Sequence, residues 1–530
     1  MEYHLPPMSA HSPDPAAPGH VVVRFAPSPT GYLHLGSART GLYNYIFARR
    51  HGGTFILRIE DTDLSRSTDA AIAQILSSMR EMGLEWDEGP EVPGPHGPYR
   101  QTERQAIYHE YIEKLLATDD LYPCFCTPEE LEAERQAAQA ERRAWVYGGR
   151  CRALPSEEVE RRQAAGEPFT LRMHVPRGKT VFSDLLRDPV EFDNDTIGDF
   201  IVQRSDGTIT YNLAVVVDDV TMGITHVIRG DDHISNTPKQ IVVYEALGAP
   251  VPAFVHMPLL FGTDKKKLSK RHGATKLEEL TAMGYLVEVV RNYLAFLSTE
   301  FDESMIAWTL DDLVRQFDVE KLGTSASIFD PEKLRWMNGR FIRQMSLQAL
   351  AERLIAYLTR VGFYGDPARV GEVTAAGPRA LAEAVEGGET APVPAMAPSA
   401  EQERLTRAVA PLVQEKVEVL ADFVPIAGWF FRPLALTEEA RERLAGTVGA
   451  AETLTAAAAG LRALPQWQAE GVEALVRDLP SCLEVKPKAV FAALRLGMSG
   501  QAVTPGLFES LWVLGRDEAA SRLERAAALL

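Results

Sequence analysis

The sequence predicts an α/β fold, with a parallel sheet in its first half and almost only helices after about residue 285. Near the start, the β-branched run Val21–Phe25 is a predicted strand, and Pro and Gly residues end it. The next apolar residues are spaced three and four apart, as on one face of a helix: Leu35, Ala38, Leu42, Tyr45 and Ile46. Gly52-Gly53 ends this helix, and Thr54–Ile59 is the next strand. Such a strand–helix–strand unit forms a right-handed crossover in a parallel, Rossmann-type sheet.

Further strands are predicted on both sides of a segment with a different texture. Three apolar runs extend the sheet: Ile209–Val217, Ile224–Ile228 and Phe254–Leu260. Residues between about 105 and 205 are mainly helical in pattern, with strand-like pieces around Thr170–Val175 and Val181–Leu185. We interpret this segment as an α+β insertion between the two halves of the sheet.

The length of 530 residues suggests about three or four domains, at roughly 150 residues each. The expected division is a disordered tail at 1–20, the first half of the Rossmann-type domain at 21–105, the insertion at 106–205, the second half at 206–285, a helical domain at 286–345 and a helical region at 346–530. Residues 365–400 are rich in Ala, Pro and Gly, so a linker is expected there.

The composition is that of a soluble globular protein, with 45% hydrophobic and 24% charged residues. No apolar run reaches about 18 residues, so no membrane span is expected, and residues 1–20 lack the pattern of a secretory signal. Four cysteines are too few to cross-link this chain, which favours a reducing cytoplasm. The net charge of -18 weighs against a nucleic-acid partner, but binding depends on where the positive charges lie.

The first predicted strand leads through a Pro/Gly turn into a helix start that carries His34, Gly36 and Ser37. Unpaired amide groups and the helix dipole favour an anion at such a place, and glycine lets a phosphate approach the backbone. His34 is suited to donate to a phosphate oxygen as negative charge develops on it. The alternative is a strand–helix corner with a surface histidine.

Two motifs resemble those of the class I aminoacyl-tRNA synthetases. His34-Leu35-Gly36-Ser37 is similar to the HIGH motif, with Ser37 in place of its last histidine, and the preceding Arg24–Gly31 resembles the glutamyl branch. Far downstream, Lys267–Arg271 is similar to the KMSKS loop. Alone, this run is typical of a solvated basic loop, but the order of the two motifs across an α/β sheet favours the family. The resemblance covers about residues 21–345 and, more loosely, 400–530.

The resemblance implies an ATP site built by both motifs. Its residues would be His34, Gly36, Ser37, Asp232, Leu260, Lys267, Leu268, Ser269, Lys270 and Arg271, with His34, Lys267 and Lys270 as the catalytic groups. A lysine loop together with Mg²⁺ can neutralise a leaving pyrophosphate without covalent chemistry. We expect Lys270 to make the most important of these contacts.

The glutamyl branch further implies a glutamate site at Arg24, Ser28, Glu60, Tyr211 and Arg229. The strand pattern agrees, because ligands of open α/β sheets bind beyond the carboxyl ends of the strands, where four of these residues are expected. A guanidinium matches a carboxylate at two points, so the arginines are assigned to carboxylates and Glu60 to the ammonium group. An asparagine of some relatives is Val215 here. The alternative for Glu60–Asp63 is a metal-binding or merely acidic loop.

Three cysteines lie in the insertion, in the pattern Cys124-Phe-Cys126 followed by Cys151. Many bacterial relatives bind structural zinc with a histidine two residues after the third cysteine, and that position is Ala153 here. Tetrahedral zinc needs four ligands. Three ordinary buried thiols are therefore the favoured interpretation, and zinc completed by His174 or a water is the alternative.

The resemblance implies ATP-dependent ligation of L-glutamate to the 3′ end of tRNA(Glu) through glutamyl-adenylate, by a cytoplasmic monomer. The insertion would bind the acceptor end, residues 286–345 the stem and 346–530 the anticodon. Candidate phosphate contacts in the insertion are Arg142, Arg143, Arg150 and Arg152.

A non-catalytic tRNA-binding paralogue should have lost His34, Lys270 or Arg24, and an enzyme that glutamylates a modified tRNA base should lack the long second half. A nucleotidyltransferase for a small cofactor would share the motif at the helix start, but it would not need so long a chain or an arginine-lined site for an amino acid. Charging of tRNA(Gln) stays undecided.

Overall fold

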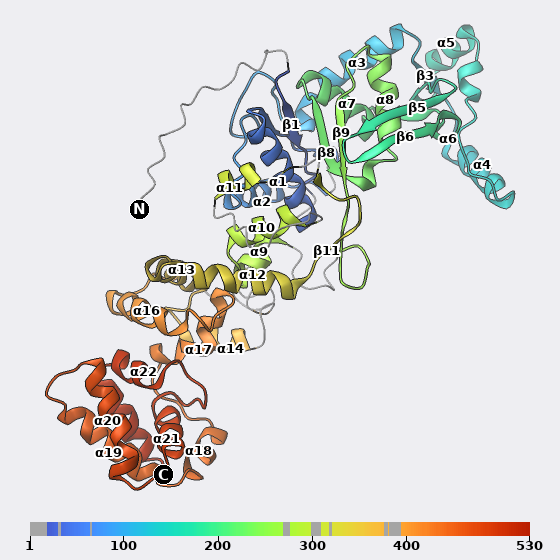
Figure 1. The fold of residues 1–530 in the computed structure, drawn as a ribbon. Helices are drawn as coiled ribbons and strands as arrows, with labels where there is room; N and C mark the ends of the chain where they lie inside the picture. Colours follow the sequence, from blue (N-terminus) through green and yellow to red (C-terminus); the bar gives the residue numbers. More distant parts are fainter. Residues whose placement is uncertain are drawn as a thin grey trace. The chain divides into compact units, whose positions relative to one another are not determined.

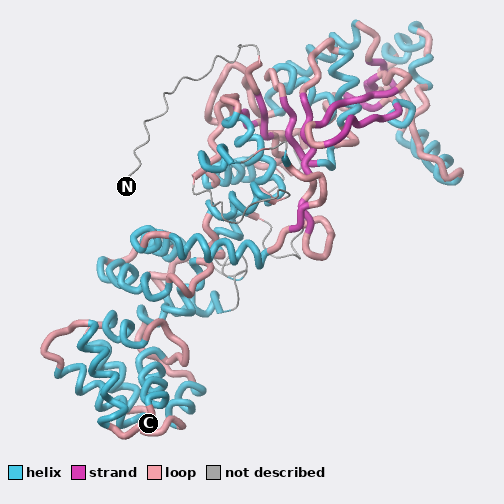
Figure 2. The backbone as a smooth tube through the Cα atoms, viewed as in Figure 1, coloured by secondary structure: helices cyan, strands magenta, loops and turns pink. Residues whose placement is uncertain are grey.

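The computed structural model describes residues 19–29, 33–63, 66–268, 276–297, 309–316, 318, 321–375, 380 and 394–530 (Figure 1). The chain divides into two compact units. The first comprises residues 1–272 and 291–329 and holds the strands; the second comprises 273–290 and 330–530 and is helical, as Figure 2 shows. This agrees with the predicted change from α/β to helical structure. None of the described helices is both long and apolar enough to cross a membrane.

A six-stranded sheet in the order β2-β1-β8-β9-β5-β6 is the centre of the first unit. Its strands are β1 (Val22–Phe25), β2 (Thr54–Leu57), β5 (Lys179–Asp184), β6 (Arg187–Asp193), β8 (His226–Gly230) and β9 (Ala253–Met257). The first five strands in this order run parallel, and β6 is antiparallel to β5. The predicted parallel, Rossmann-type sheet is therefore present, with the predicted strand–helix–strand unit at β1, α1 (Leu35–Arg50) and β2.

The other elements of this unit surround the sheet or form smaller sheets. A three-stranded sheet contains β3 (Leu121–Cys124), β4 (Thr170–Met173) and β7 (Phe200–Gln203), and a parallel pair contains β10 (Leu260–Phe261) and β11 (Ser327–Ile328). The helices are α2 (Asp69–Glu81), α3 (Gln105–Ala117), α4 (Pro128–Ala140), α5 (Ser156–Ala164), α6 (Asn194–Ile197), α7 (Tyr211–Thr221), α8 (Thr237–Ala246) and α11 (Leu310–Gln316), with short 3-10 turns η1 (Gln101–Arg104), η2 (Arg150–Ala153) and η3 (Asp231–His233).

The prediction of a strand at Ile209–Val217 is wrong, because α7 spans Tyr211–Thr221. Its residues Leu213–Val217 are all buried, in a core that α3 and α8 share. A continuous apolar run does not distinguish a buried strand from a helix buried on most of its surface. The consequence for function is that Asp218 and Asp219, at the end of this run, lie on a helix inside the protein.

The predicted insertion also contributes to the main sheet. The piece predicted around Val181–Leu185 is β5, which pairs with β9 in parallel and with β6 in a hairpin. The remaining predicted strand of the insertion, around Thr170–Val175, is β4 of the three-stranded sheet. Strands β5 and β6 thus lie within the 106–205 segment in sequence and at the edge of the Rossmann-type sheet in space.

Five neighbouring strands share one pattern at their carboxyl ends. One apolar residue of each strand lies in a common core: Ile56, Val22, Val227, Phe254 and Phe182. Successive side chains of a strand alternate between faces, so the residue two positions later lies on the same face. In sheet order from β2 to β5, these later residues are Arg58, Arg24, Arg229, His256 and Asp184. A row of polar side chains therefore borders the apolar core on this face.

The second unit consists of packed helices. They are α9 (Leu277–Ala282), α12 (Pro331–Gln344), α13 (Leu347–Arg360), α14 (Pro367–Ala375), α16 (Ala400–Val413), α17 (Phe423–Ala427), α18 (Glu438–Ala445), α19 (Ala450–Ala463), α20 (Ala469–Cys482), α21 (Pro487–Ser499), α22 (Leu507–Leu514) and α23 (Arg516–Ala527), with 3-10 turns η6 (Leu420–Asp422) and η7 (Gly428–Phe431), while α10 (Val287–Phe296) spans the division between units. Of the predicted 365–400 linker, residues 367–375 are helical and 394–399 have no regular structure.

Candidate active site

The start of α1 has the features of an anion site. His34 is the N-cap residue in extended conformation, its carbonyl accepts from the Ala38 amide at 2.8 Å, and the first turn carries no acidic residue. His34 and Gly36 are exposed and Ser37 is half-buried, so the three predicted ATP residues lie together at the helix start. Their amides are available to a phosphate, which the helix dipole favours.

Lys267 and Leu268 of the predicted lysine loop lie near two other residues predicted for ATP, Asp232 and Leu260. The Lys267 Nζ atom is 3.6 Å from an Asp232 carboxylate oxygen, and both side chains are substantially exposed. The Leu268 amide donates to the carbonyl of Leu260, a buried residue of β10, at 3.0 Å. Four predicted ATP residues are thereby brought together. Ser269, Lys270 and Arg271 lie outside the described residues.

Arg24 is buried, at 4% exposure, and its Nε donates to Asp219 on α7 at 3.1 Å. The same Asp219 oxygen accepts from Arg58 Nη1 at 2.6 Å. Burial alone would raise the pKa of Asp219, but Arg24 and Arg58 outweigh it, and the pKa lies below its ordinary value. Arg24 is therefore held in the core by a carboxylate that stays ionised.

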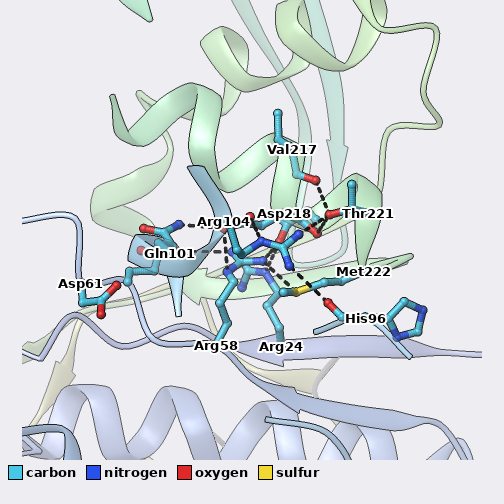
Figure 3. A network of polar contacts seen from close by, with 12 residues as sticks. Arg24, Arg58, Asp61, His96, Gln101, Arg104, Val217, Asp218, Thr221 and Met222 are labelled. Carbon is cyan, nitrogen blue, oxygen red and sulfur yellow. Dashed lines mark hydrogen bonds and ion pairs between the residues drawn. The ribbon is translucent and has the colours of Figure 1, made fainter. Parts of the chain in front are cut away.

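The adjacent Asp218 holds a second set of donors (Figure 3). Its two carboxylate oxygens accept from Arg104 Nε at 2.6 Å, Gln101 Nε2 at 2.8 Å and the Tyr108 hydroxyl at 3.1 Å. All of these side chains are buried. Asp218 and Asp219 thus connect α7 with β1, with the residue after β2 and with the start of α3.

Glu60 follows β2 and is bound to the same network. Its Oε1 accepts from Arg58 Nη2 at 3.2 Å. Burial raises the pKa of Glu60 above its ordinary value, although Arg58 and Arg24 oppose that change. Ser28, by contrast, is exposed beyond the end of β1.

Arg229 lies near the carboxyl end of β8 and has partners of a different kind. Its Nη2 donates to the Thr237 hydroxyl at 2.7 Å and its Nε to His256 Nε2 at 3.2 Å. Its Nη1 is buried and has no hydrogen-bond partner in the described part of the chain. Burial lowers the pKa of Arg229 from its ordinary value. This guanidinium therefore lacks a carboxylate contact that a bound acid could supply.

Tyr211 and His233 lie beside the two arginines. The Tyr211 hydroxyl is 3.1 Å from His233 Nδ1. Burial raises the pKa of Tyr211, and Glu60, Arg229 and Arg24 also act on it electrostatically. Burial and the positive charge of Arg229 lower the pKa of His233 to about 4, so this ring is neutral at pH 7. Four of the five residues predicted for glutamate are thus electrostatic neighbours.

Sequence reasoning missed the residues that hold these side chains in place. They are Arg58, Asp184, Asp218, Asp219, His233, Thr237 and His256. The alternation within strands could have identified Arg58, Asp184 and His256, because each follows an apolar strand residue by two positions. Asp218 and Asp219 gave no comparable signal, because the residues of α7 were predicted as a strand.

The three cysteines of the predicted insertion form a cluster with their sulfur atoms within 4.8 Å of one another. The sulfur atoms of Cys126 and Cys151 are 3.4 Å apart. The Tyr147 hydroxyl lies 3.4 Å from the sulfurs of both Cys124 and Cys126. All four cysteines of the chain are free thiols.

Comparisons with known proteins cover nearly the whole chain. Residues 20–336 match the family of class I tRNA synthetases (E and Q), catalytic domain, and residues 350–527 match an anticodon binding domain. Glutamate–tRNA ligase 2 of Rubrobacter xylanophilus is 42% identical over 95% of this chain and 96% of its own. The glutamate–tRNA ligase of Moorella thermoacetica is 41% identical over 96% and 98%.

A solved structure shows the same fold. It is a glutamate tRNA ligase from Elizabethkingia meningosepticum in complex with its amino acid, with a TM-score of 0.79 and 28% identity over 96% of this chain and 99% of that one. The fold of the described residues, the family models and the relatives that match over nearly the whole chain all indicate the same family. The chain belongs to the class I tRNA synthetases of the E and Q group and, within that group, to the glutamate–tRNA ligases.

Proposed function

We propose that this ligase attaches L-glutamate to tRNA(Glu) in two steps. An oxygen of the glutamate α-carboxylate attacks the α-phosphorus of ATP, and the bond to the leaving pyrophosphate breaks, which gives glutamyl-adenylate. The terminal 2′-hydroxyl of the tRNA then attacks the activated carbonyl, and AMP leaves with the bonding electrons. Positioning and charge stabilisation are sufficient for such steps, without a protein nucleophile.

The observation that carries the glutamate site is Arg229 Nη1, which has no hydrogen-bond partner among the described residues. A buried donor without an acceptor costs free energy, and a ligand carboxylate removes that cost. Arg229 lies at the carboxyl end of β8, and Arg24 lies in the neighbouring strand β1. We assign the two arginines to the carboxylates of glutamate, Glu60 to its ammonium group, and Ser28 and Tyr211 to the rim of the site.

The helix start and the lysine loop are assigned to ATP. His34, Gly36 and Ser37 present donors at the start of α1, which suits the phosphates of ATP entering with Mg²⁺. Lys267, together with Lys270, would neutralise the pyrophosphate as it leaves. Asp232 and Leu260 lie next to the loop, and Ser269 and Arg271 belong to it by sequence.

The amino-acid assignment is tested with Arg24→Leu and a matched control, Arg80→Leu, in aminoacylation assays with purified tRNA. Arg80 is half-exposed and pairs with Glu91 outside the site, so its loss should leave both KM values unchanged. Arg24→Leu should raise the glutamate KM by about tenfold or more, the effect of one lost contact to a charged group, and the ATP KM much less. Equal increases in the two KM values would remove Arg24 from the amino-acid site.

The thiol cluster fits a structural zinc ion if Tyr147 is the fourth donor. A tetrahedron with Zn–S bonds of about 2.3 Å and a Zn–O bond of about 2.0 Å has edges of about 3.5–3.8 Å. The three sulfurs lie within 4.8 Å of one another, and the Tyr147 oxygen lies 3.4 Å from two of them. Tyr147 would thus replace the histidine ligand of many bacterial relatives, whose position is Ala153 in this chain. Less than about a tenth of an equivalent of zinc in the purified protein would end this proposal.

For tRNA, we propose three contact regions: the insertion, helix α12 of the 286–345 region, and the helices that match the anticodon binding domain. Within the insertion, the guanidinium groups of Arg143, Arg150 and Arg152 already pair with Glu141, Glu130 and Asp199. On α12, Trp336 is 40% exposed and the Arg340 guanidinium lies 5.0 Å from its ring centroid, a surface suited to stacking and phosphate contact. We expect a monomer that acts in the cytoplasm.

A further inference from the structure

We propose that His256 and Asp184 are positioning residues for Arg229: they orient its guanidinium so that Nη1 faces the substrate carboxylate. This inference rests on the proposed role of Arg229 in glutamate binding. It concerns the part of the polar row that lies on β8, β9 and β5, where these three residues occupy neighbouring strands. His256 and Asp184 are assigned no contact with glutamate or ATP and act through Arg229.

The contacts form an unbroken buried chain. The His256 ring is fully buried, its Nδ1 is 2.6 Å from Asp184 Oδ2, and its Nε2 is 3.2 Å from Arg229 Nε. The Thr237 hydroxyl lies 2.9 Å from the same Nε2 and accepts from Arg229 Nη2 at 2.7 Å. The strands are in register here, since Arg229 is paired with His256 in the β8–β9 ladder.

The chemistry of the partners determines which ring nitrogen carries the proton. A guanidinium has donors only, so Arg229 Nε–H requires a lone pair on His256 Nε2. The single ring proton of a neutral imidazole then lies on Nδ1 and is donated to the Asp184 carboxylate. A carboxylate that fixes the tautomer of a histidine, which in turn orients a cation, is thus built into the sheet.

Asp184 is itself held from several directions. Its carboxylate accepts from the backbone amides of His256 at 3.0 Å and Leu186 at 2.9 Å. Arg187 Nη1 lies 4.0 Å from Asp184 Oδ1, and this guanidinium also donates to the His256 carbonyl and pairs with Asp231. The acceptor therefore has little freedom to rotate, and neither has the ring that donates to it.

The consequence falls on the geometry of Arg229. A guanidinium is planar, so fixing Nε on His256 and Nη2 on Thr237 also fixes the direction of Nη1. Nη1 is the buried nitrogen of Arg229 for which the described part of the chain supplies no partner. The protein thus engages one edge of the guanidinium with neutral acceptors and leaves the remaining nitrogen, with its share of the positive charge, for an acidic ligand.

The decisive experiment compares His256→Asn with His256→Gln in aminoacylation assays. The Asn amide can replace Nδ1–H as a donor to Asp184 but presents nothing to Arg229, whereas the Gln oxygen can reach the position of Nε2 and accept from Arg229. We expect His256→Asn to raise the glutamate KM about tenfold, with the ATP KM unchanged, and His256→Gln to stay within about threefold of wild type. A merely structural role for His256 predicts no such split between the two variants.

Thr237→Val and Thr237→Ser provide a second pair that does not disturb His256, in case either histidine variant fails to fold. The serine keeps the acceptor for Arg229 Nη2 and the valine removes it, so only valine should raise the glutamate KM. Equal effects within each pair, or no effect in either, would overturn the inference. Arg229→Leu is measured in parallel: an unchanged glutamate KM there would instead refute the proposed site role of Arg229 itself.

Discussion

The β1 side and the β8 side of the sheet each bury an arginine predicted for glutamate, Arg24 and Arg229, and the charge of the partners of these two arginines differs. Arg24 donates to Asp219, a carboxylate that a second arginine, Arg58, also contacts. Arg229 donates to a neutral ring and a hydroxyl, and its Nη1 has no partner among the residues that the structure describes. The pKa of Asp219 is lowered by its two arginines, whereas burial lowers the pKa of Arg229. The β1 side therefore favours the folded state, and the β8 side carries a cost that a ligand can remove.

Breaking the β1 side should have the largest effect on stability. Asp219→Asn keeps the size of the side chain but leaves Arg24 and Arg58 buried without their shared carboxylate. Removing one partner of a buried ion pair costs about 3–5 kcal/mol. The measurement is calorimetry of the full chain, read on the unfolding transition that ATP and glutamate shift to higher temperature.

The matched control for that variant is Glu91→Gln, which breaks the exposed pair between Arg80 and Glu91. An exposed ion pair contributes at most about 1 kcal/mol, so the same transition should hardly move. If Asp219→Asn also cost less than about 1 kcal/mol, the network of Figure 3 would not be a stabilising element, and the contrast between the two sides would disappear.

Arg229→Met should separate stability from function on the β8 side. The variant removes a buried cation that has no carboxylate partner in the described part of the chain, and the lone pair that it frees on His256 Nε2 can accept from the Thr237 hydroxyl. We expect the free energy of unfolding to stay within about 1 kcal/mol of wild type or to rise, as is common when strained site residues are replaced. In calorimetry, glutamate should no longer raise the transition temperature. A loss as large as that of Asp219→Asn would instead show that Arg229 stabilises the fold.

The same contrast explains what could be predicted from the sequence. The strand–helix–strand unit β1–α1–β2 follows from periodicity. The strand pattern also places Arg24 and Arg229 near the carboxyl ends of parallel strands, whereas their role toward glutamate is what the family resemblance implies. The residues that hold these two arginines in place are harder to predict from the sequence. Asp219 lies on a helix whose apolar run fits a strand equally well, and Asp184 belongs to a strand that returns to the sheet from within the insertion. Both depend on tertiary packing, which short-range patterns do not contain.

The smallest expected effect concerns Glu60, which follows β2 and contacts Arg58. Its pKa is raised by burial, whereas that of Asp219 is lowered, so the two carboxyl groups should influence stability with opposite signs. The contribution of Asp219 is fully present above the unfolded-state pKa of about 3.9 and is lost as the pH falls through its lower folded-state pKa. For Glu60, ionisation costs stability: the cost appears as the pH rises through the unfolded-state pKa of about 4.3 and is complete above its folded-state pKa.

Glu60→Gln should therefore be slightly more stable than wild type at pH 7, and the difference should narrow as the pH falls toward the unfolded-state pKa of Glu60. Calorimetry of both proteins between about pH 4 and pH 8 measures this difference, and Asp219→Asn provides the opposite sign over the same range. Glutamate should reverse the order, because its ammonium group is assigned to the ionised Glu60 and gains nothing from a neutral amide. If saturating glutamate stabilised Glu60→Gln as much as wild type, the Glu60 carboxylate would have no part in binding the amino group of glutamate.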